Sequence, residues 1–353
     1  MLDLRPRILS VGTANPPARY RQEELLERFS VTDPRLRSLF TSSHIRTRHL
    51  YLPEPLPGGG PTPESQGELL KKHRSGCKEV APIAIGRCLD DAGLTVKDID
   101  YLCCITSTGW LTPGLTAILM REMGFREDCS RVDIVGMGCN AGLNGLNPVA
   151  AWAMAHPGKN ALMVCVEICS AAYVFDMTMR TAIVNSLFGD GVAAVLVRAS
   201  ERDERQFAPK ILGFDSHIIT GAIDAMRFDW DDENGKYSFF LDRDIPYVVG
   251  ANAEKPLTRL LDAHGLKRRH ISHWVVHSGG KKVVDAIKYN IGISEYDVRH
   301  THSVLRDFGN LSSGSFLFSF QRLVKEGKVR RGDYGVLMTM GPGSTIETAL
   351  IRW

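Results

Sequence analysis

One cysteine sits where a thiol could act as a nucleophile. Cys139 follows the apolar run "VDIV" and the glycine-rich turn "GMG", and small, helix-compatible residues come after it. This order predicts a strand, a tight turn that needs glycine, and a helix that begins at the cysteine. Amides and the dipole at a helix N-terminus favour the thiolate and can lower a cysteine pKa from about 8.5 toward about 3.5–7.5. A buried structural cysteine is the alternative interpretation.

Two more residues could complete the chemistry. His277 ends the apolar run "WVVH", and Asn310 lies in "DFGNLSSGSF" ahead of a second helical pattern. An imidazole can exchange a proton with a thiol, and an amide can donate hydrogen bonds to an oxygen that gains charge during acyl transfer. A single histidine after an apolar strand is more often a satisfied structural group. The interpretation therefore depends on whether the fold brings the three side chains together.

An internal repeat predicts that the fold does so. The segment "DAGLTVKDIDYLCCITST" aligns with "LDAHGLKRRHISHWVVHSGG" at a constant offset that places Gly93 on Gly265. Each segment follows a helical pattern that its glycine would end in the left-handed conformation. A loop, a helix and a buried strand then follow both segments in the same order. Chance similarity between two α/β units is the alternative to duplication.

Duplication would set the architecture of the whole chain. Two similar halves, residues 1–205 with Cys139 and residues 206–353 with His277 and Asn310, would form an α/β fold with mixed sheets buried between helices. Helix starts and strand ends of such a fold meet near its pseudo-two-fold axis. We therefore expect the three side chains to share one pocket.

Composition limits the class of protein. The chain has 353 residues, of which 44% are hydrophobic and 24% charged, as in ordinary globular proteins. It contains no uncharged apolar run of eighteen residues and no signal-peptide pattern, so we expect a cytoplasmic protein without a membrane anchor. Its eight cysteines lie mostly in apolar runs, which indicates reduced thiols. A net charge of +3 is too small and too dispersed for a nucleic-acid binder.

Five motifs stand in a fixed order along the chain: "GCNAG", "LFGDG", "HSGG", "GNLSSG" and "MGPGSTIE". In this order they resemble a known family, the type III polyketide synthases of the thiolase superfamily. The likeness runs over nearly the whole chain. Several segments, among them "DAMRFDWD" and "HSGGKKVVDA", are most similar to the bacterial subgroup that makes 3,5-dihydroxyphenylacetyl-CoA, rather than to plant chalcone synthases.

The resemblance implies a thiolase-like duplicated fold, layered αβαβα, and an acyltransferase. Cys139 would carry the growing acyl chain, and His277 and Asn310 would donate hydrogen bonds to the thioester oxygen of malonyl-CoA as it loses carbon dioxide. Four malonyl-CoA units would be condensed and cyclised to 3,5-dihydroxyphenylacetyl-CoA in a secondary-metabolite pathway of the glycopeptide-antibiotic type. The resemblance further implies a homodimer that uses coenzyme A thioesters as substrates, with no cofactor and no metal.

The same resemblance assigns residues around the cavity. Phe188 and Phe239 would be aromatic gatekeepers between the coenzyme A tunnel and the cavity, although both could equally be core phenylalanines. Gly279 and Gly280 would let the backbone approach the pantetheine arm. Gly341, Pro342 and Gly343 would shape the cavity, and Cys169 and Ala172 would line it where plant enzymes have threonines.

Binding of the coenzyme A phosphates is the least defined part of the resemblance. Arg35 matches one of three basic residues of the chalcone-type pattern, but Ser38 and Ser42 stand at the other two positions. Other basic residues could substitute for them. A solvated basic face is the alternative interpretation. The candidates for substitution are Arg37, Arg46, Arg48 and the pair Lys281 and Lys282.

Other classes of protein deserve comparison. A zinc site could draw on His270, His273 and His277, or on Cys165 and Cys169, but no paired CxxC accompanies them. A papain-like hydrolase would also combine a cysteine, a histidine and an asparagine, but the segment around Cys139 lacks the "CGSCW"-like signature of that class. A β-ketoacyl synthase III that uses a carrier protein is the nearest rival, and a non-catalytic partner subunit is the rival from another class.

Overall fold

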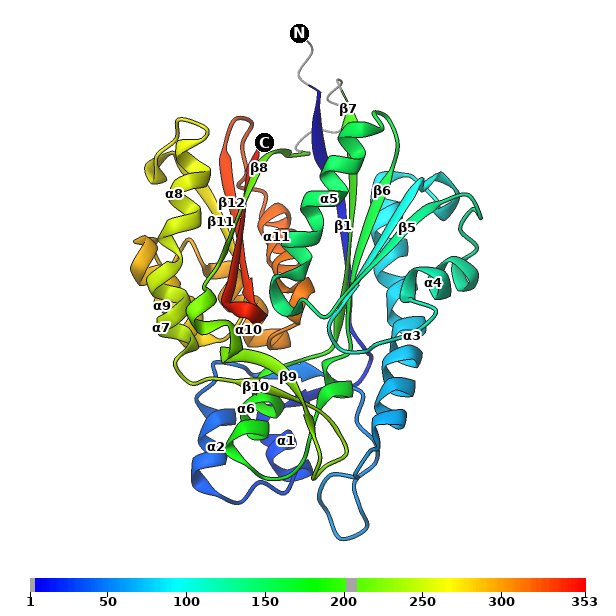
Figure 1. Cartoon of the computed structure of the whole chain (residues 1–353), viewed down its shortest axis with the longest axis vertical. Coiled ribbons are helices and arrows are strands. Elements are labelled where there is room, and N and C mark those ends of the chain that lie inside the picture. The colour runs from blue at the N-terminus through cyan, green and yellow to red at the C-terminus, as the bar shows by residue number, and fades with distance from the viewer. Residues whose placement is uncertain (1–3, 201–207) are drawn as a thin grey trace.

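Figure 1 shows the computed structural model of the chain, which describes residues 4–200 and 208–353. Two groups of strands flank a central pair of helices, and further helices cover the outer face of each group. This is the expected αβαβα layering of an α/β fold. The central helices are α5 (Ala141–Ala155) and α11 (Ser315–Lys325). The outer helices are α3 (Gln66–Ala92) and α4 (Leu115–Met123) on one side, and α7 (Ile245–Asn252), α8 (Glu254–Asp262) and α9 (Lys281–Ile291) on the other.

The strands form one nine-stranded mixed sheet in the order β11-β12-β13-β8-β1-β7-β6-β4-β5. The strand order reads alike outward from the β1–β8 junction in both halves: β4 and β6 are parallel, as are β11 and β12, and the pairs that follow inward are antiparallel. The halves join where Arg7 of β1 pairs with Lys210 of β8, next to a hydrogen bond from the Ile8 N–H to Pro209 O at 3.0 Å. The strands are β1 (Arg5–Ala14), β4 (Tyr101–Thr106), β5 (Ser130–Val135), β6 (Ala161–Glu167), β7 (Gly191–Ser200), β8 (Lys210–Ile218), β11 (Ile271–Val276), β12 (Tyr334–Gly341) and β13 (Thr345–Arg352).

This symmetry agrees with the duplication that the repeat predicts. Gly93 ends α3 in the left-handed conformation with φ 67°, and Gly265 has φ 64° just after α8. β5 lies at the sheet edge and has no counterpart in the second half. The proposed boundary at residues 205 and 206 falls outside the described residues.

A smaller cap lies at one end of the layers, at the bottom of Figure 1. It gathers segments from both halves, so its contacts are non-local. Its elements are β2 (Arg19–Arg21), α1 (Gln22–Arg28), α2 (Pro34–Thr41), β3 (Thr47–His49), α6 (Met179–Leu187), β9 (Met226–Asp231) and β10 (Lys236–Leu241), while α10 (Arg299–Phe308) leads into the central layer.

The central helices approach each other closely at their N-terminal ends. A side chain at Gly142 in α5 would overlap the carbonyl of Ser313, which lies just ahead of α11. Leu143, Leu146 and Phe316 fill the space between the two strand groups and are fully buried. The two equivalent helix starts are therefore held side by side at the centre of the molecule. Within residues 4–200 and 208–353, no helix has both the length and the apolar character needed to cross a bilayer.

Candidate active site

Cys139 lies at the strand-turn-helix junction that the sequence predicts. β5 ends at Val135, Gly136 and Gly138 adopt φ values of 83° and 76°, and a 3-10 turn over Gly138–Asn140 leads into α5. The Gly138 amide donates to the Ser107 hydroxyl at 2.8 Å, which fixes the turn to the end of β4. A Cβ atom at Gly138 would overlap the ring of Pro342. Glycine is therefore required here both by conformation and by space.

Asn310 is the predicted partner that the structure brings to the cysteine. Its Nδ2 atom donates to Cys139 Sγ at 3.9 Å, while its Oδ1 atom accepts from the Ser312 amide at 2.8 Å. That second bond orients the amide so that its donor side faces the sulfur. The Asn310 backbone is fixed as well, because its N–H donates to Leu187 O and its carbonyl accepts from the Gly189 amide, both at 2.9 Å.

His277 follows β11 directly and is almost fully buried. Its backbone N–H donates to Met338 O on the neighbouring strand β12 at 2.8 Å. β12 runs on to Gly341, where a side chain would overlap the backbone amides of Asn140 and Cys139. The same strand therefore contacts both the His277 backbone and the Cys139 turn, while no hydrogen bond joins the side chains of His277 and Cys139 within the described residues. The His277 Nδ1 atom has no hydrogen-bond partner among the described residues.

Burial controls the protonation of the site. It raises the pKa of Cys139 to about 12, against the opposing effect of hydrogen bonds from Ser312 and Asn310. Burial also lowers the pKa of His277 to about 3. The expectation that the helix terminus lowers the pKa of this cysteine is therefore wrong for the ligand-free chain, because loss of water outweighs the hydrogen bonds that favour the thiolate. The thiol and the imidazole are both neutral at pH 7, and a proton must move when the sulfur attacks.

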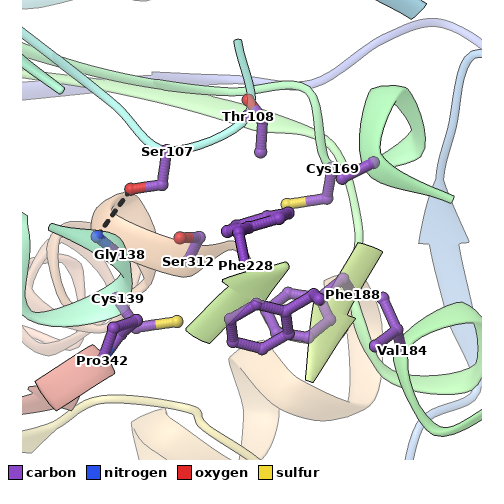
Figure 2. A pocket seen from close by; sticks show the side chains of 12 residues that line it. Ser107, Thr108, Gly138, Cys139, Cys169, Val184, Phe188, Phe228, Ser312 and Pro342 are labelled. Atoms are coloured by element: carbon purple, nitrogen blue, oxygen red, sulfur yellow. Dashed lines mark hydrogen bonds between the residues drawn. The ribbon is translucent and has the colours of Figure 1, made fainter. Parts of the chain in front are cut away.

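The cysteine opens into a pocket with a mainly apolar lining. Phe188 and Phe239 both line it, with ring centroids 5.7 Å apart in an edge-to-face arrangement. Figure 2 shows the Cys139 sulfur pointing toward the phenylalanine rings. Cys169, Ala172 and Pro342 lie in the cavity wall, as the sequence predicts.

Sequence reasoning missed Phe228, which also lines the cavity and packs against Phe239 with ring centroids 4.9 Å apart and the rings tilted. The two phenylalanines are register partners in the β9–β10 hairpin, so they share one face of that hairpin. Pairing "MRFDWD" with "KYSFFL" across the turn could have found this residue.

Glu167, at the end of β6, was missed too. It is fully buried, accepts hydrogen bonds from the Ser107 amide at 3.0 Å and from the Ser313 hydroxyl, and burial raises its pKa to about 7. A lone glutamate that ends the apolar run "ALMVCVE" was the available signal.

The glycines that the resemblance assigns occupy two loops at the cavity. Gly280, with φ 129°, precedes α9 next to Leu187, and Gly279 packs on the His277 ring. Gly343, with φ 73°, follows Pro342 in the turn between β12 and β13. Of these two loops, the second contributes Pro342 to the cavity wall.

The basic residues considered for phosphate binding lie in different environments. Arg35 is exposed on α2, and Lys281 pairs with Asp285 at 2.6 Å on α9. Arg37 bonds the Val31 carbonyl. Arg48 is completely buried, so the suggestion that it binds coenzyme A phosphates is wrong.

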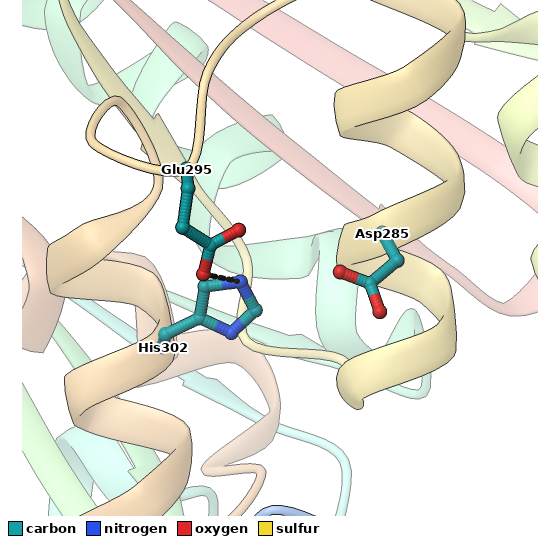
Figure 3. A group of neighbouring side chains, drawn as sticks. All are labelled: Asp285, Glu295 and His302. Carbon is teal, nitrogen blue, oxygen red and sulfur yellow. Dashed lines mark ion pairs between the residues drawn. The ribbon is translucent and has the colours of Figure 1, made fainter.

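The histidines of the zinc alternative are used elsewhere. His273 bonds Asp333 at 2.8 Å, and His270 accepts from the Lys267 amide at 3.0 Å. Figure 3 shows another group of possible ligands, Asp285, Glu295 and His302.

Lysines already occupy the carboxylates of this second group. Lys288 pairs with Glu295 at 2.5 Å and with Asp285 at 3.4 Å, and Lys281 also pairs with Asp285. We therefore assign the group to a surface ion-pair network.

The fold and the buried cysteine beside an amide define a thiolase-like condensing enzyme. Two solved structures support this class. "1,3,6,8-Tetrahydroxynaphthalene Synthase" from Streptomyces coelicolor matches with a TM-score of 0.88 and 29% identity, covering 98% of this chain and 99% of that one. "PKS-I" from the brown alga Ectocarpus siliculosus matches with a TM-score of 0.89 and 27% identity, covering 99% and 98%.

Sequence comparisons define the family. Residues 43–263 match "FAE1/Type III polyketide synthase-like protein", and residues 229–353 match "Chalcone and stilbene synthases, C-terminal domain". The chain is 58% identical to "3,5-dihydroxyphenylacetyl-CoA synthase" of Amycolatopsis balhimycina, over 98% of this chain and 93% of the relative. A protein of the same name from Streptomyces toyocaensis is 56% identical, over 99% and 90%. The chain belongs to the type III polyketide synthases, which confirms the resemblance seen in its motifs.

Proposed function

We propose that this enzyme condenses four malonyl-CoA units, one serving as starter, and cyclises the C8 chain to 3,5-dihydroxyphenylacetyl-CoA. The observation that carries the proposal is the 56–58% identity, over nearly the full chain, to synthases with that name. The apolar cavity beside Cys139 supports it, because a reactive polyketide needs a space that excludes water. The pathway would be one of antibiotic biosynthesis.

Loading of the cysteine is the first step. His277 takes the proton from the Cys139 thiol as the sulfur attacks the thioester carbonyl of malonyl-CoA. The acyl–sulfur bond to coenzyme A breaks, and the departing thiolate receives the proton from His277. A neutral imidazole in the resting site suits this role, because it can accept the proton only when the sulfur begins to react.

Condensation follows at the same place. His277 and the Asn310 amide donate hydrogen bonds to the thioester oxygen of a second malonyl-CoA, where charge grows as carbon dioxide leaves. The resulting enolate carbon attacks the acyl-Cys139 carbonyl, a carbon–carbon bond forms, and the sulfur departs. The lengthened chain can then return to Cys139. This chemistry uses coenzyme A thioesters alone and requires neither cofactor nor metal.

The remaining residues would guide the substrate. Phe188 and Phe239 would separate the coenzyme A tunnel from the cavity, and their edge-to-face contact supports this assignment. Gly279 and Gly280 would admit the pantetheine arm, and the Gly341–Gly343 turn would shape the cavity. Arg35 would bind a coenzyme A phosphate, which its exposed position on α2 permits.

We also infer that the protein is a cytoplasmic homodimer. Each copy would consist of two thiolase-like halves, residues 1–205 and 206–353. All eight cysteines are free and buried, as expected in a reducing compartment. The edge strand β5 exposes Val132 and Val135 next to the Cys139 turn, which supports pairing of two copies there.

Incubating the purified protein with malonyl-CoA alone tests the proposal. A C8 aromatic coenzyme A thioester, identified by mass, is the expected product. A pyrone would leave the class of synthase intact but contradict the named product. Turnover only with an added carrier protein would favour a β-ketoacyl synthase III instead.

A further inference from the structure

A positively charged side chain is buried beneath the wall of the cavity. Arg48, on β3, has no solvent exposure and belongs to the largest fully buried side chains. No carboxylate of the described residues forms an ion pair with it that would explain its position. Burying a cation without an ion pair is costly, so its hydrogen bonds must hold it.

Those hydrogen bonds go to the end of α6, where the chain turns toward Phe188. Arg48 Nη1 donates to the Phe188 carbonyl and to the Tyr173 hydroxyl, both at 2.7 Å, and Tyr173 donates to the same carbonyl at 2.6 Å. Arg48 Nε donates to Gln22 Oε1 at 3.0 Å, and the Gln22 amide in turn donates to Ser186 O at 2.9 Å. A cation and an amide thus satisfy carbonyls that the helix terminus leaves free.

The same arginine also touches the segment that carries Asn310. Gly309, with φ 73°, leaves room for the aliphatic part of Arg48, which a side chain at that position would overlap. Residues 187–189 pair with Asn310 through the two backbone hydrogen bonds described above and an isolated β-bridge between Phe188 and Asn310. Arg48 therefore contacts both sides of this bridge, its head group on one and its stem on the other.

We propose that Arg48 is a positioning residue that fixes the Phe188 ring and the Asn310 amide relative to Cys139. This inference rests on the proposed function. Two of the three nitrogens in the rigid guanidinium plane, Nε and Nη1, reach the Gln22 oxygen, the Phe188 carbonyl and the Tyr173 hydroxyl at once, whereas a lysine ammonium would not reach all three. The third nitrogen, Nη2, has no hydrogen-bond partner among the described residues. Arg48 acts on the reaction through the bridge and does not touch the reacting atoms.

The test compares Arg48→Met and Arg48→Lys with the wild-type enzyme. Both variants keep the loading of Cys139, which does not need the Asn310 amide. We expect malonyl-CoA decarboxylation by Arg48→Met to fall about tenfold in kcat with a KM change below threefold, since small misplacements of a catalytic group are costly. Arg48→Lys should recover part of the loss. The released products should also shift toward shorter or pyrone species, because the Phe188 ring loses its support.

Arg7→Met is the matched control, since Arg7 is a buried arginine on β1 that donates to Ala208 O and does not line the cavity. It should lower thermal stability without changing the ratio of products. Tyr173→Phe removes one hydroxyl and should change the decarboxylation kcat and the product ratio in the same direction as Arg48→Met, but less. This variant replaces Arg48→Met in the test if Arg48→Met does not fold. Variants that lose only stability, with wild-type kcat and product ratio, would overturn the inference. If the wild-type enzyme itself does not condense malonyl-CoA, the proposed function fails instead.

Discussion

At the scale of single residues, the site divides two tasks between a sulfur and an amide. Cys139 would carry the acyl chain, and Asn310 would stabilise the enolate that forms beside it. The two groups lie 3.9 Å apart, close enough for the enolate carbon to reach an acyl carbonyl on the sulfur. Each task can therefore be removed without the other.

Replacing Cys139 by alanine should abolish elongation while leaving measurable malonyl-CoA decarboxylation, because the donors to the thioester oxygen remain. Carbon dioxide release and polyketide formation are measured side by side. Cys169→Ala is the control, since this thiol lines the same cavity but has no role in the mechanism. Equal loss of both activities in Cys139→Ala would contradict the division of tasks.

Replacing Asn310 by alanine should have the converse effect. Decarboxylation should fall by about 10²–10³ in kcat, the usual effect of losing one donor to a developing oxyanion. Loading of Cys139, followed by intact-protein mass, should persist. Asn144→Ala removes a side-chain amide from α5 that bonds Glu347 and should leave both steps near wild type. A wild-type decarboxylation rate in Asn310→Ala would exclude the proposed role.

Glu167 offers a test through pH. Burial raises its pKa to about 7 from an ordinary value of 4.5, so the folded chain holds this proton more tightly than the unfolded chain. The stabilisation of the folded state by this bound proton is complete below pH 4.5 and is lost as pH rises through 7. Glu167→Gln lacks this titration, so between pH 5 and pH 8 its free energy of unfolding should rise relative to wild type by about 2–3 kcal/mol.

Urea unfolding at the two pH values measures this difference. The Glu127→Gln change provides the baseline, because it removes one carboxylate at an exposed position. A constant gap between Glu167→Gln and wild type would show that Glu167 is ionised to the same extent in both states.

At the scale of elements, the turn between β5 and α5 sets the position of the nucleophile. Gly138→Ala should lose at least tenfold in condensation rate, because the new methyl group must displace Pro342 and the cavity wall with it. Gly158→Ala is a close match, since Gly158 has φ 81° and nothing within 4 Å of the added Cβ. Both changes should cost about 1–2 kcal/mol of stability from backbone strain. Only Gly138→Ala should affect catalysis, and equal activity in the two variants would contradict this account.

The elements also show what the sequence could predict. Glycine spacing and apolar runs were enough to predict the strand-turn-helix at Cys139 and the left-handed conformation of Gly93 and Gly265, because these features depend on local backbone chemistry. The contact between Cys139 and Asn310 followed from the repeat. Arg48 was assigned to the wrong role, and Phe228 was missed. The roles of both residues depend on contacts made by the cap, whose segments come from distant parts of the chain.

At the scale of the whole molecule, duplication explains why the site lies at the centre. The two half-sheets place the starts of α5 and α11 side by side. The first half therefore contributes the Cys139 thiol to the site, and the second half contributes the Asn310 amide. The sequence could not predict how the half-sheets join, because that connection depends on a short stretch of backbone contacts, among them the pair Arg7 and Lys210. Neither half contains both the thiol and the amide.

The proposed homodimer is testable at this scale. Val132→Asp places a charge on the exposed edge strand β5 and should shift the protein from dimer to monomer in light scattering coupled to gel filtration. Tyr289→Asp, at a highly exposed position on the outer helix α9, should leave the dimer intact. A dimer that survives Val132→Asp but not Tyr289→Asp would place the interface on the opposite side of the molecule.

The most direct measurement is to find where the acyl chain is attached. Rapid quenching of the enzyme with malonyl-CoA, followed by proteolysis and peptide mass analysis, should show the adduct on the peptide that contains Cys139. An adduct on the peptide that contains Cys169 instead, or no adduct while polyketide accumulates, would contradict the account.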